Sequence, residues 1–204
     1  MNTRVSEILA DIRKLEEELE EAIRTHQVEF LYRVEGAKVR FERAAKLAHQ
    51  KLKIGIFRWL RESQLRNVAS APVVYFMIVP LVMLDIFVSL YQIICFPLYG
   101  ITIVHRGRFI VMDRHQLSYL NAIEKFNCVY CGYANGLIAY VREVIARTEQ
   151  YWCPIKHARK ILDPHRRYAR FADFGQAEDF QEHVEAMRKS LRDAGDPTNN
   201  SLPG

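Results

Sequence analysis

The spacing of apolar and polar residues changes along the chain and divides it into distinct parts. From Met1 to Val34, apolar or small residues recur at alternating spacings of three and four, which is typical of a helix with a heptad seam. The members of that seam are Val5, Ile8, Ile12, Leu15, Leu19 and Ala22. After a break at Gly36, the pattern predicts a second, basic helix from Ala37 to Arg66. An almost wholly apolar run then extends from Val73 to Phe96.

The apolar run is long enough to enter a lipid bilayer. It contains 24 residues, and Asp85 is the only Asp, Glu, Lys or Arg between Val73 and Val104. A membrane-spanning helix needs about 20 predominantly apolar residues. The alternative is a buried core helix, but runs of this length are uncommon in small soluble domains. The run therefore predicts an element embedded in the membrane at residues 73–97.

Two topologies fit this element. A single span would place the flanking regions on opposite faces, whereas a re-entrant or interfacial element, bent near Pro80, would keep both in the cytoplasm. Nine basic residues oppose two acidic ones between Gly36 and Arg66, and a second basic block spans Lys156 to Arg170. Basic flanks favour the cytoplasmic face and anionic lipid. They favour the second topology, and without a nucleic-acid motif they predict lipid rather than nucleic acid as the partner.

Three polar residues interrupt the run at helical spacing. Asp85, Ser89 and Gln92 stand at i, i+4 and i+7 and therefore share one face of a helix. A carboxylate is expensive in lipid, so this face should meet protein or water. A contact between helices is the simpler interpretation, and a proton or ion path is the alternative.

The remainder of the chain predicts a mainly α-helical protein with one small β-hairpin at most. The hairpin would join Ile101–Val104 to Phe109–Met112, flanking a glycine-containing turn. Helices are expected at 114–126, 136–150 and 176–192, with a break at Asn135-Gly136, and the tail 195–204 should be disordered. The predicted organisation is a helical region at 1–66, the membrane element at 73–97, a cysteine-containing helical region at 98–194 and the tail. Glu143 and Arg147 are expected to form solvent-facing helix pairs.

The cysteines supply the candidate chemistry. Cys128 and Cys131 form a C-x-x-C pair followed by Gly132, and Cys153 and His157 could complete a four-ligand set. Three cysteines and one histidine are a normal structural zinc set. A straight helix over 136–150, however, would separate its ends by about 20 Å. A site for one ion would then need a broken helix or a second subunit.

The string CVYCGY from Cys128 to Tyr133 resembles the first metal-binding knuckle of rubredoxins, and Cys153-Pro154 is similar to the start of their second. That resemblance implies an iron site for electron transfer. The chain departs from the pattern at the fourth ligand, where it has Lys156 and His157 instead of cysteine. The stretch from Asn127 to His157 is also similar to a family of uncharacterised bacterial membrane proteins. This likeness implies a bacterial inner membrane and no activity. The basic flanks and the three thiols predict that the soluble regions face the cytoplasm.

Two functions follow from these features. The sequence has no glycine-rich phosphate loop, no G-x-S-x-G and no H-E-x-x-H, which favours a protein that is not an enzyme. The first hypothesis is a membrane-associated scaffold or assembly protein with a structural metal, zinc, at Cys128 and Cys131. The alternative is a membrane-bound redox protein that uses the same thiols as a dithiol or an iron site. The heptad seam and the polar membrane face also predict a protein partner or a homo-oligomer.

Overall fold

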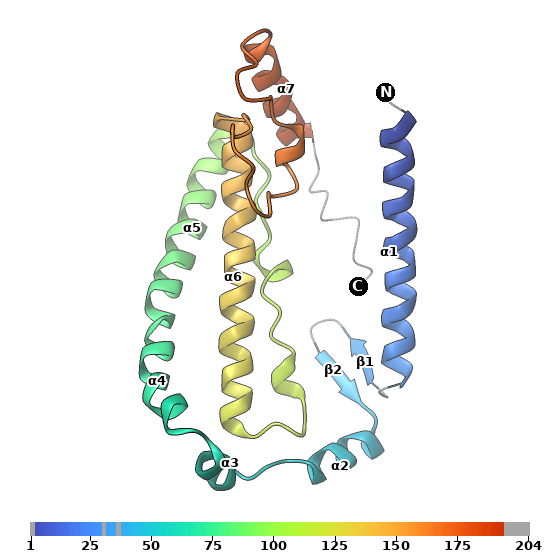
Figure 1. Cartoon of the computed structure of the whole chain (residues 1–204), viewed down its shortest axis with the longest axis vertical. Helices are drawn as coiled ribbons and strands as arrows, with labels where there is room; N and C mark the ends of the chain where they lie inside the picture. The colour runs from blue at the N-terminus through green and yellow to red at the C-terminus, as the bar shows by residue number, and fades with distance from the viewer. Residues whose placement is uncertain (1–2, 30–31, 36–37, 194–204) are drawn as a thin grey trace. The chain divides into compact units, whose positions relative to one another are not determined.

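The computed structural model describes residues 3–29, 32–35 and 38–193, and in these residues the protein is mainly α-helical (Figure 1). This confirms the mainly α-helical character predicted from the sequence. The predicted disordered tail lies outside the described residues. The described residues form two units, one drawn from residues 3–60 and 113–125 and the other from residues 61–112 and 126–193.

The first unit begins with helix α1 (Thr3–Glu29) and a two-stranded antiparallel sheet of β1 (Tyr32–Glu35) and β2 (Lys38–Phe41). Helices α2 (Arg43–Lys51) and α3 (Ile56–Glu62) follow. The first predicted long helix is confirmed as α1, although it ends at Glu29. The second, from Ala37 to Arg66, is wrong, because a strand and short helices replace it. The missed signal is an alternation of period two, since Tyr32, Val34, Val39 and Phe41 alternate with charged residues around a glycine. That pattern is typical of a hairpin.

Helix α1 keeps an exposed apolar stripe. Leu15, Leu19 and Ile23 are all exposed, and exposed glutamates surround them. The side chains of Val5, Ile8 and Ile12, which begin the predicted seam, lie outside the described set. In the part that the structure describes, the seam residues are not covered by the chain itself.

The second unit contains the apolar run as helices α4 (Leu65–Phe76) and α5 (Ile78–Tyr99), which are separated only by Met77. Pro80 has no N–H to donate to the carbonyl of Phe76, which accounts for the break at Met77. At its other end, α5 continues through Pro97 and ends at Gly100, whose φ of +67° allows the Ile101 N–H to bond the Phe96 carbonyl at 2.8 Å. Among the described residues, Leu65–Tyr99 is the one helical stretch long and apolar enough to cross a membrane by length and composition.

Helix α6 (Ala122–Trp152) is continuous, so the break predicted at Asn135-Gly136 is wrong. Its start is capped reciprocally, because the Asn121 N–H donates to Glu124 at 2.8 Å and the Glu124 N–H donates to Asn121 at 3.0 Å. Gly136 serves close packing instead of a turn. A Cβ on Gly136 would lie 2.5 Å from the Phe109 carbonyl oxygen, so only glycine allows the backbone of that segment so near the helix.

Segment 101–112 contains no strand, and the predicted hairpin there is wrong; the segment is irregular, with a 3₁₀ turn η1 (Arg106–Arg108). It runs back along the unit and allows α5 and α6 to lie parallel (Figure 1). Tyr75 bonds Asn127 near the start of both helices, and Tyr99 stacks on Tyr151 near their ends. The core between these elements consists of Phe96, Ile101, Val104, Leu137, Tyr140, Val144 and Leu191.

The unit is closed by α7 (Phe180–Asp193), the amphipathic helix that the sequence predicts at 176–192. Before it, residues 153–179 are mostly irregular, with a 3₁₀ turn η3 (Tyr168–Arg170) and an isolated bridge between Ile155 and Ala172. Gln150 of α6 donates to the Met187 carbonyl at 3.1 Å and to the Ser190 hydroxyl at 2.8 Å, which fixes α7 to the end of α6.

Candidate functional site

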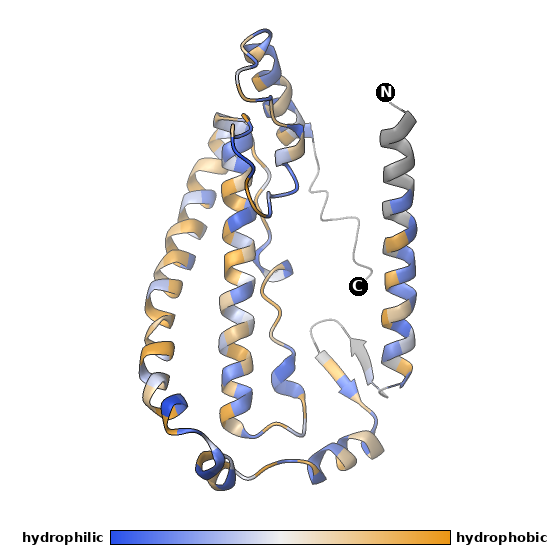
Figure 2. Ribbon diagram, viewed as in Figure 1, coloured by the Kyte–Doolittle hydropathy of each residue, from blue (hydrophilic) through white to orange (hydrophobic). Residues whose placement is uncertain are grey.

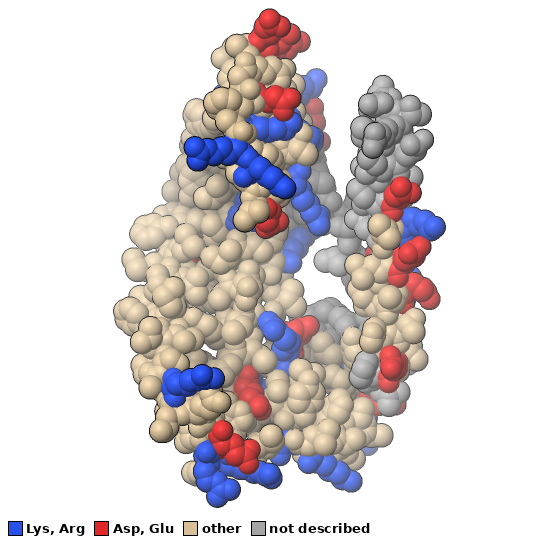
Figure 3. All heavy atoms as spheres, in the orientation of Figure 1, with Lys and Arg blue, Asp and Glu red and all other residues tan. Residues whose placement is uncertain are grey.

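Helix α5 has two faces of opposite character. Its outward face is exposed and apolar along the whole helix; the large residues on it are Val79, Val82, Met83, Ile86, Phe87, Leu90, Ile93, Ile94 and Leu98. Figure 2 shows this helix as predominantly hydrophobic, and Figure 3 shows a broad surface without charged side chains over it. An apolar face of this length is unusual on a monomeric soluble protein and marks a surface that lipid or protein covers.

The inward face carries the polar residues that the sequence placed together. The Asp85 carboxylate accepts two hydrogen bonds from Arg106, Nε to Oδ1 at 3.0 Å and Nη2 to Oδ2 at 2.5 Å. It also accepts a hydrogen bond from the Tyr133 hydroxyl at 2.9 Å and one from Ser89 at 3.3 Å. The Arg106 guanidinium lies over the Tyr133 ring, 5.9 Å from its centroid. Asp85 is therefore paired within the chain.

About two turns after Asp85 on α5, the Gln92 side chain hydrogen-bonds to the backbone of the irregular segment 101–112. Its amide oxygen accepts the Val104 N–H at 3.1 Å, and its amide nitrogen donates to the Val104 carbonyl at 3.2 Å. The same nitrogen donates to the Tyr140 hydroxyl at 2.7 Å, and that hydroxyl lies 3.2 Å from the Ser89 hydroxyl. Gln92 and Tyr140 are both buried. The polar face thus binds segment 101–112 and helix α6 to α5.

This arrangement favours a structural contact over a proton or ion path. The carboxylate of Asp85 is occupied by an arginine, a tyrosine and a serine, all from the same chain. The sequence could not identify Arg106, Tyr133 and Tyr140 as the partners. They lie 21 to 51 residues away from the α5 residues that they bind, and no motif links them.

The four candidate metal ligands are not brought together within the chain. Cys128 and Cys131 lie inside α6, whereas Cys153 and His157 follow its end. At 1.5 Å per residue, Cys131 and Cys153 are separated by about 33 Å along the helix axis. Among the described residues, no group of three or more His, Cys, Asp or Glu side chains is placed to hold one metal ion. One chain therefore offers at most the C-x-x-C pair.

The helical setting also limits dithiol chemistry. All four cysteines are free, with Cys131 and Cys153 exposed and Cys95 and Cys128 half-buried. Side chains three residues apart on a helix have Cβ atoms about 5–6 Å apart. A disulfide needs a Cβ separation of about 3.5–4.5 Å. Oxidation of Cys128 and Cys131 to a disulfide would thus require α6 to distort at that point.

A second polar cluster, near the end of α6, corrects the expectation that Glu143 and Arg147 face solvent. Arg147 is buried and donates to Glu143 at 2.8 Å and to the Thr102 carbonyl at 2.6 Å. Arg167, also buried, donates to the same Glu143 oxygen at 2.7 Å and to Gln150 at 2.9 Å. Burial raises the pKa of Glu143, but hydrogen bonds from Arg167 and Arg147 outweigh burial and hold the pKa below its ordinary value. The cluster fastens residues 153–172 to α6.

Comparison of the chain with protein-family models, with curated proteins and with solved structures finds no match. The two faces of α5 and the surfaces that the chain leaves uncovered are the features that bear on function.

Proposed function

We propose that the protein is a non-catalytic scaffold anchored in the membrane through the outward face of α5. The observation that carries the proposal is the separation of the two faces of this helix. Asp85, Ser89 and Gln92 all form hydrogen bonds within the chain. The opposite face of α5 presents exposed apolar residues from Val79 to Leu98. Covering that face with acyl chains stabilises the protein, because each buried large apolar side chain contributes roughly 1.5–3 kcal/mol.

Within this proposal, α5 lies along the membrane interface rather than across the bilayer. Segment 101–112 has irregular backbone and carries the exposed residues His105 and Arg106 beside α5. Irregular backbone is tolerated at the depth of the hydrocarbon only where protein or water surrounds it. A lone transbilayer α5 would carry this segment into lipid, whereas an interfacial α5 leaves it on the aqueous side. Both flanks then face the cytoplasm, which suits the basic residues and the free thiols of a protein in a bacterial inner membrane.

The scaffold's partner surface is the stripe of Leu15, Leu19 and Ile23 on α1. These side chains are exposed at a spacing of four residues and are flanked by exposed glutamates, including Glu18 and Glu20. A partner helix, from a second copy or another protein, would bury them as in a helical bundle. Mass measurement in mild detergent over a range of concentrations tests self-association, with Leu19→Glu as the variant that should abolish it. A wild-type mass that is monomeric at every concentration contradicts the second copy.

A metal at Cys128 and Cys131 remains a separate part of the proposal and would have to take further ligands from a second chain. Zinc would pin two helices together, and iron would indicate the redox alternative. Elemental analysis and an optical spectrum of protein purified without added metal distinguish the two. Protein without bound metal whose assembly is unaffected by Cys128→Ser contradicts a metal at this site.

The anchoring proposal is tested by vesicle flotation with matched substitutions. Phe87 on the outward face of α5 is 63% exposed, and Phe174, in the irregular segment before α7, is 68% exposed. Phe87→Glu, combined with Leu90→Glu, should release the protein from vesicles, while Phe174→Glu should float with them as wild type does. Retention of the α5 variant, or release of both, contradicts anchoring through this face.

Cysteine labelling separates the interfacial helix from a span. Cys131, in the first half of α6, and Cys153, directly after its end, are both exposed. In variants that keep only one of them, a membrane-impermeant maleimide should label both from the cytoplasmic side of sealed vesicles and neither from the other side. Labelling of the two cysteines from opposite sides would establish a transbilayer arrangement instead.

A further inference from the structure

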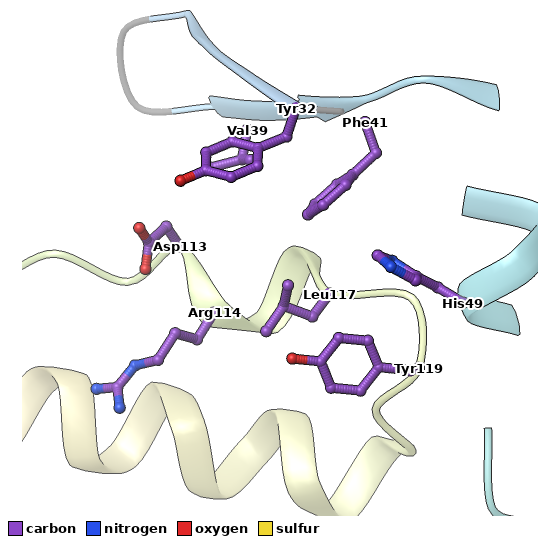
Figure 4. Close-up of a pocket in the computed structure, with 8 residues that line it drawn as sticks. All are labelled: Tyr32, Val39, Phe41, His49, Asp113, Arg114, Leu117 and Tyr119. Atoms are coloured by element: carbon purple, nitrogen blue, oxygen red, sulfur yellow. The ribbon is translucent and has the colours of Figure 1, made fainter. Parts of the chain in front are cut away.

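The first unit contains a cavity of about 390 Å³ that the membrane anchor does not use. It is lined by the β-hairpin, by α2 and by the segment before α6; the lining residues are Tyr32, Val39, Phe41, His49, Asp113, Arg114, Leu117 and Tyr119 (Figure 4). Its size falls within the range of about 300–1,000 Å³ that is usual for small-molecule sites. The hairpin is held to the segment by a long-range hydrogen bond, from the Val39 N–H to the Gln116 side chain at 2.7 Å.

Four of the eight residues that line the cavity carry aromatic rings, and these rings contact one another. The Tyr32 and Phe41 ring centroids are 5.6 Å apart and tilted, and Phe41 meets His49 edge-on at 5.4 Å. His49 in turn meets Tyr119 edge-on at 5.5 Å. Figure 4 shows these rings as a continuous series around the cavity, with Leu117 among them. Aromatic rings that line a cavity attract cations that approach their electron-rich faces.

The placement of the charged residues at the cavity also favours a cation as the guest. Figure 4 shows the Asp113 carboxylate on the side toward which the Tyr32 hydroxyl points, while the Arg114 guanidinium extends away from the four rings. Asp113 and Arg114 are the two charged residues that line the cavity. His49 adds a polar atom, since its Nδ1 is buried without a hydrogen-bond partner among the described residues. Because the Arg114 guanidinium extends away from the rings, the aromatic lining together with the Asp113 carboxylate fits a cation with an apolar covering better than an anionic guest.

We propose that this cavity binds an alkylated ammonium group of the size of choline. The methyl groups of such a cation would lie against Phe41 and Tyr119, and its positive charge would face Asp113 and the ring faces. The same chemistry could be supplied by a free solute or by the headgroup of a phospholipid. The proposal concerns the first unit only and does not depend on α5 anchoring the protein.

Calorimetric titration of the full chain, in maltoside micelles that contain no ammonium group, tests the chemistry. Choline should bind saturably at one site, and its neutral isostere 3,3-dimethyl-1-butanol should bind at least tenfold more weakly. Asp113→Asn should lower the affinity for choline about tenfold, and Phe41→Leu should lower it similarly. Asp173→Asn, which removes an exposed carboxylate in the second unit, serves as the charge-matched control and should leave the affinity unchanged.

The comparison of the two ligands on wild-type protein keeps the test valid even if Phe41→Leu disturbs the hairpin. Equal binding of choline and the neutral isostere would overturn the proposal in favour of a merely apolar cavity, and absence of choline binding would overturn it outright. Repeating the titration in nanodiscs identifies the source. Weaker choline binding in phosphatidylcholine than in phosphatidylglycerol nanodiscs assigns the cavity to a lipid headgroup, and equal binding in both assigns it to a free solute.

Discussion

Arg106 donates hydrogen bonds from two nitrogens to the Asp85 carboxylate, and this ion pair joins the irregular segment 101–112 to the middle of the apolar helix α5. The two ends of the pair differ in exposure, because the Asp85 side chain is 13% exposed and that of Arg106 is 47% exposed. The buried carboxylate therefore depends on Arg106 more than Arg106 depends on it. This asymmetry predicts how the two residues respond to substitution.

Arg106→Gln should destabilise the protein more than Asp85→Asn. The first change leaves a mostly buried carboxylate without its cation, and a buried charge without a partner costs roughly 1–3 kcal/mol even when part of the pair meets water. The second change leaves an arginine that can turn to solvent. The double variant should recover part of the loss. Denaturant unfolding in micelles measures all three, and equal losses for the two single variants would contradict the asymmetry.

Gly136→Ala should destabilise the second unit by about 1–3 kcal/mol, the usual range for overpacking. The added Cβ would lie 2.5 Å from the Phe109 carbonyl oxygen and 2.7 Å from the Ile110 Cα, and backbone atoms cannot move aside as the end of a side chain can. Gly107→Ala is the matched control, because nothing lies within 4 Å of its Cβ position. Thermal unfolding of both variants tests the packing. An unchanged midpoint for Gly136→Ala would mean that segment 101–112 does not pack against α6 here.

Gly136 also shows where sequence reasoning fails. Asn-Gly is a strong turn signal, so the sequence predicted a break between two helices at this point. The actual reason for the glycine is the close approach of Phe109, 27 residues earlier in the chain, and this cannot be read from a local pattern. The shared face of Asp85, Ser89 and Gln92 was predictable, by contrast, because it depends only on helical periodicity. Their partners depend on the tertiary fold.

Gln92→Leu should increase local opening of segment 101–112 without changing helix α5. Leucine has a similar volume but would leave the Val104 N–H and carbonyl without the partners they have now at 3.1 and 3.2 Å. Each buried polar group that loses its partner costs about 1–3 kcal/mol. Hydrogen exchange should show faster exchange of the Val104 amide, while Ile93→Leu on the exposed face should leave it unchanged. Unaltered protection in Gln92→Leu would contradict the role given to this side chain.

The Glu143 cluster makes the stability of the second unit dependent on pH. Hydrogen bonds from Arg167 and Arg147 hold the pKa of Glu143 below its ordinary value of 4.5 in the folded protein, despite burial. As the pH falls, Glu143 is therefore protonated at a higher pH in the unfolded chain than in the folded protein. The contribution of Glu143 is fully present above about pH 4.5 and is lost progressively as the pH falls below that value toward the lower folded pKa.

Glu143→Gln should consequently show its largest loss of unfolding free energy near neutral pH, and the difference from wild type should narrow below about pH 4.5. Glu185→Gln is the control, since Glu185 forms an ion pair with Arg188 but is 63% exposed. Exposed pairs of this kind contribute only about 0–1 kcal/mol, so this variant should follow the wild-type pH profile. Denaturant unfolding at a series of pH values measures both. A difference for Glu143→Gln that stays constant down to pH 3 would show that the carboxylate is not held in its charged form by the two arginines.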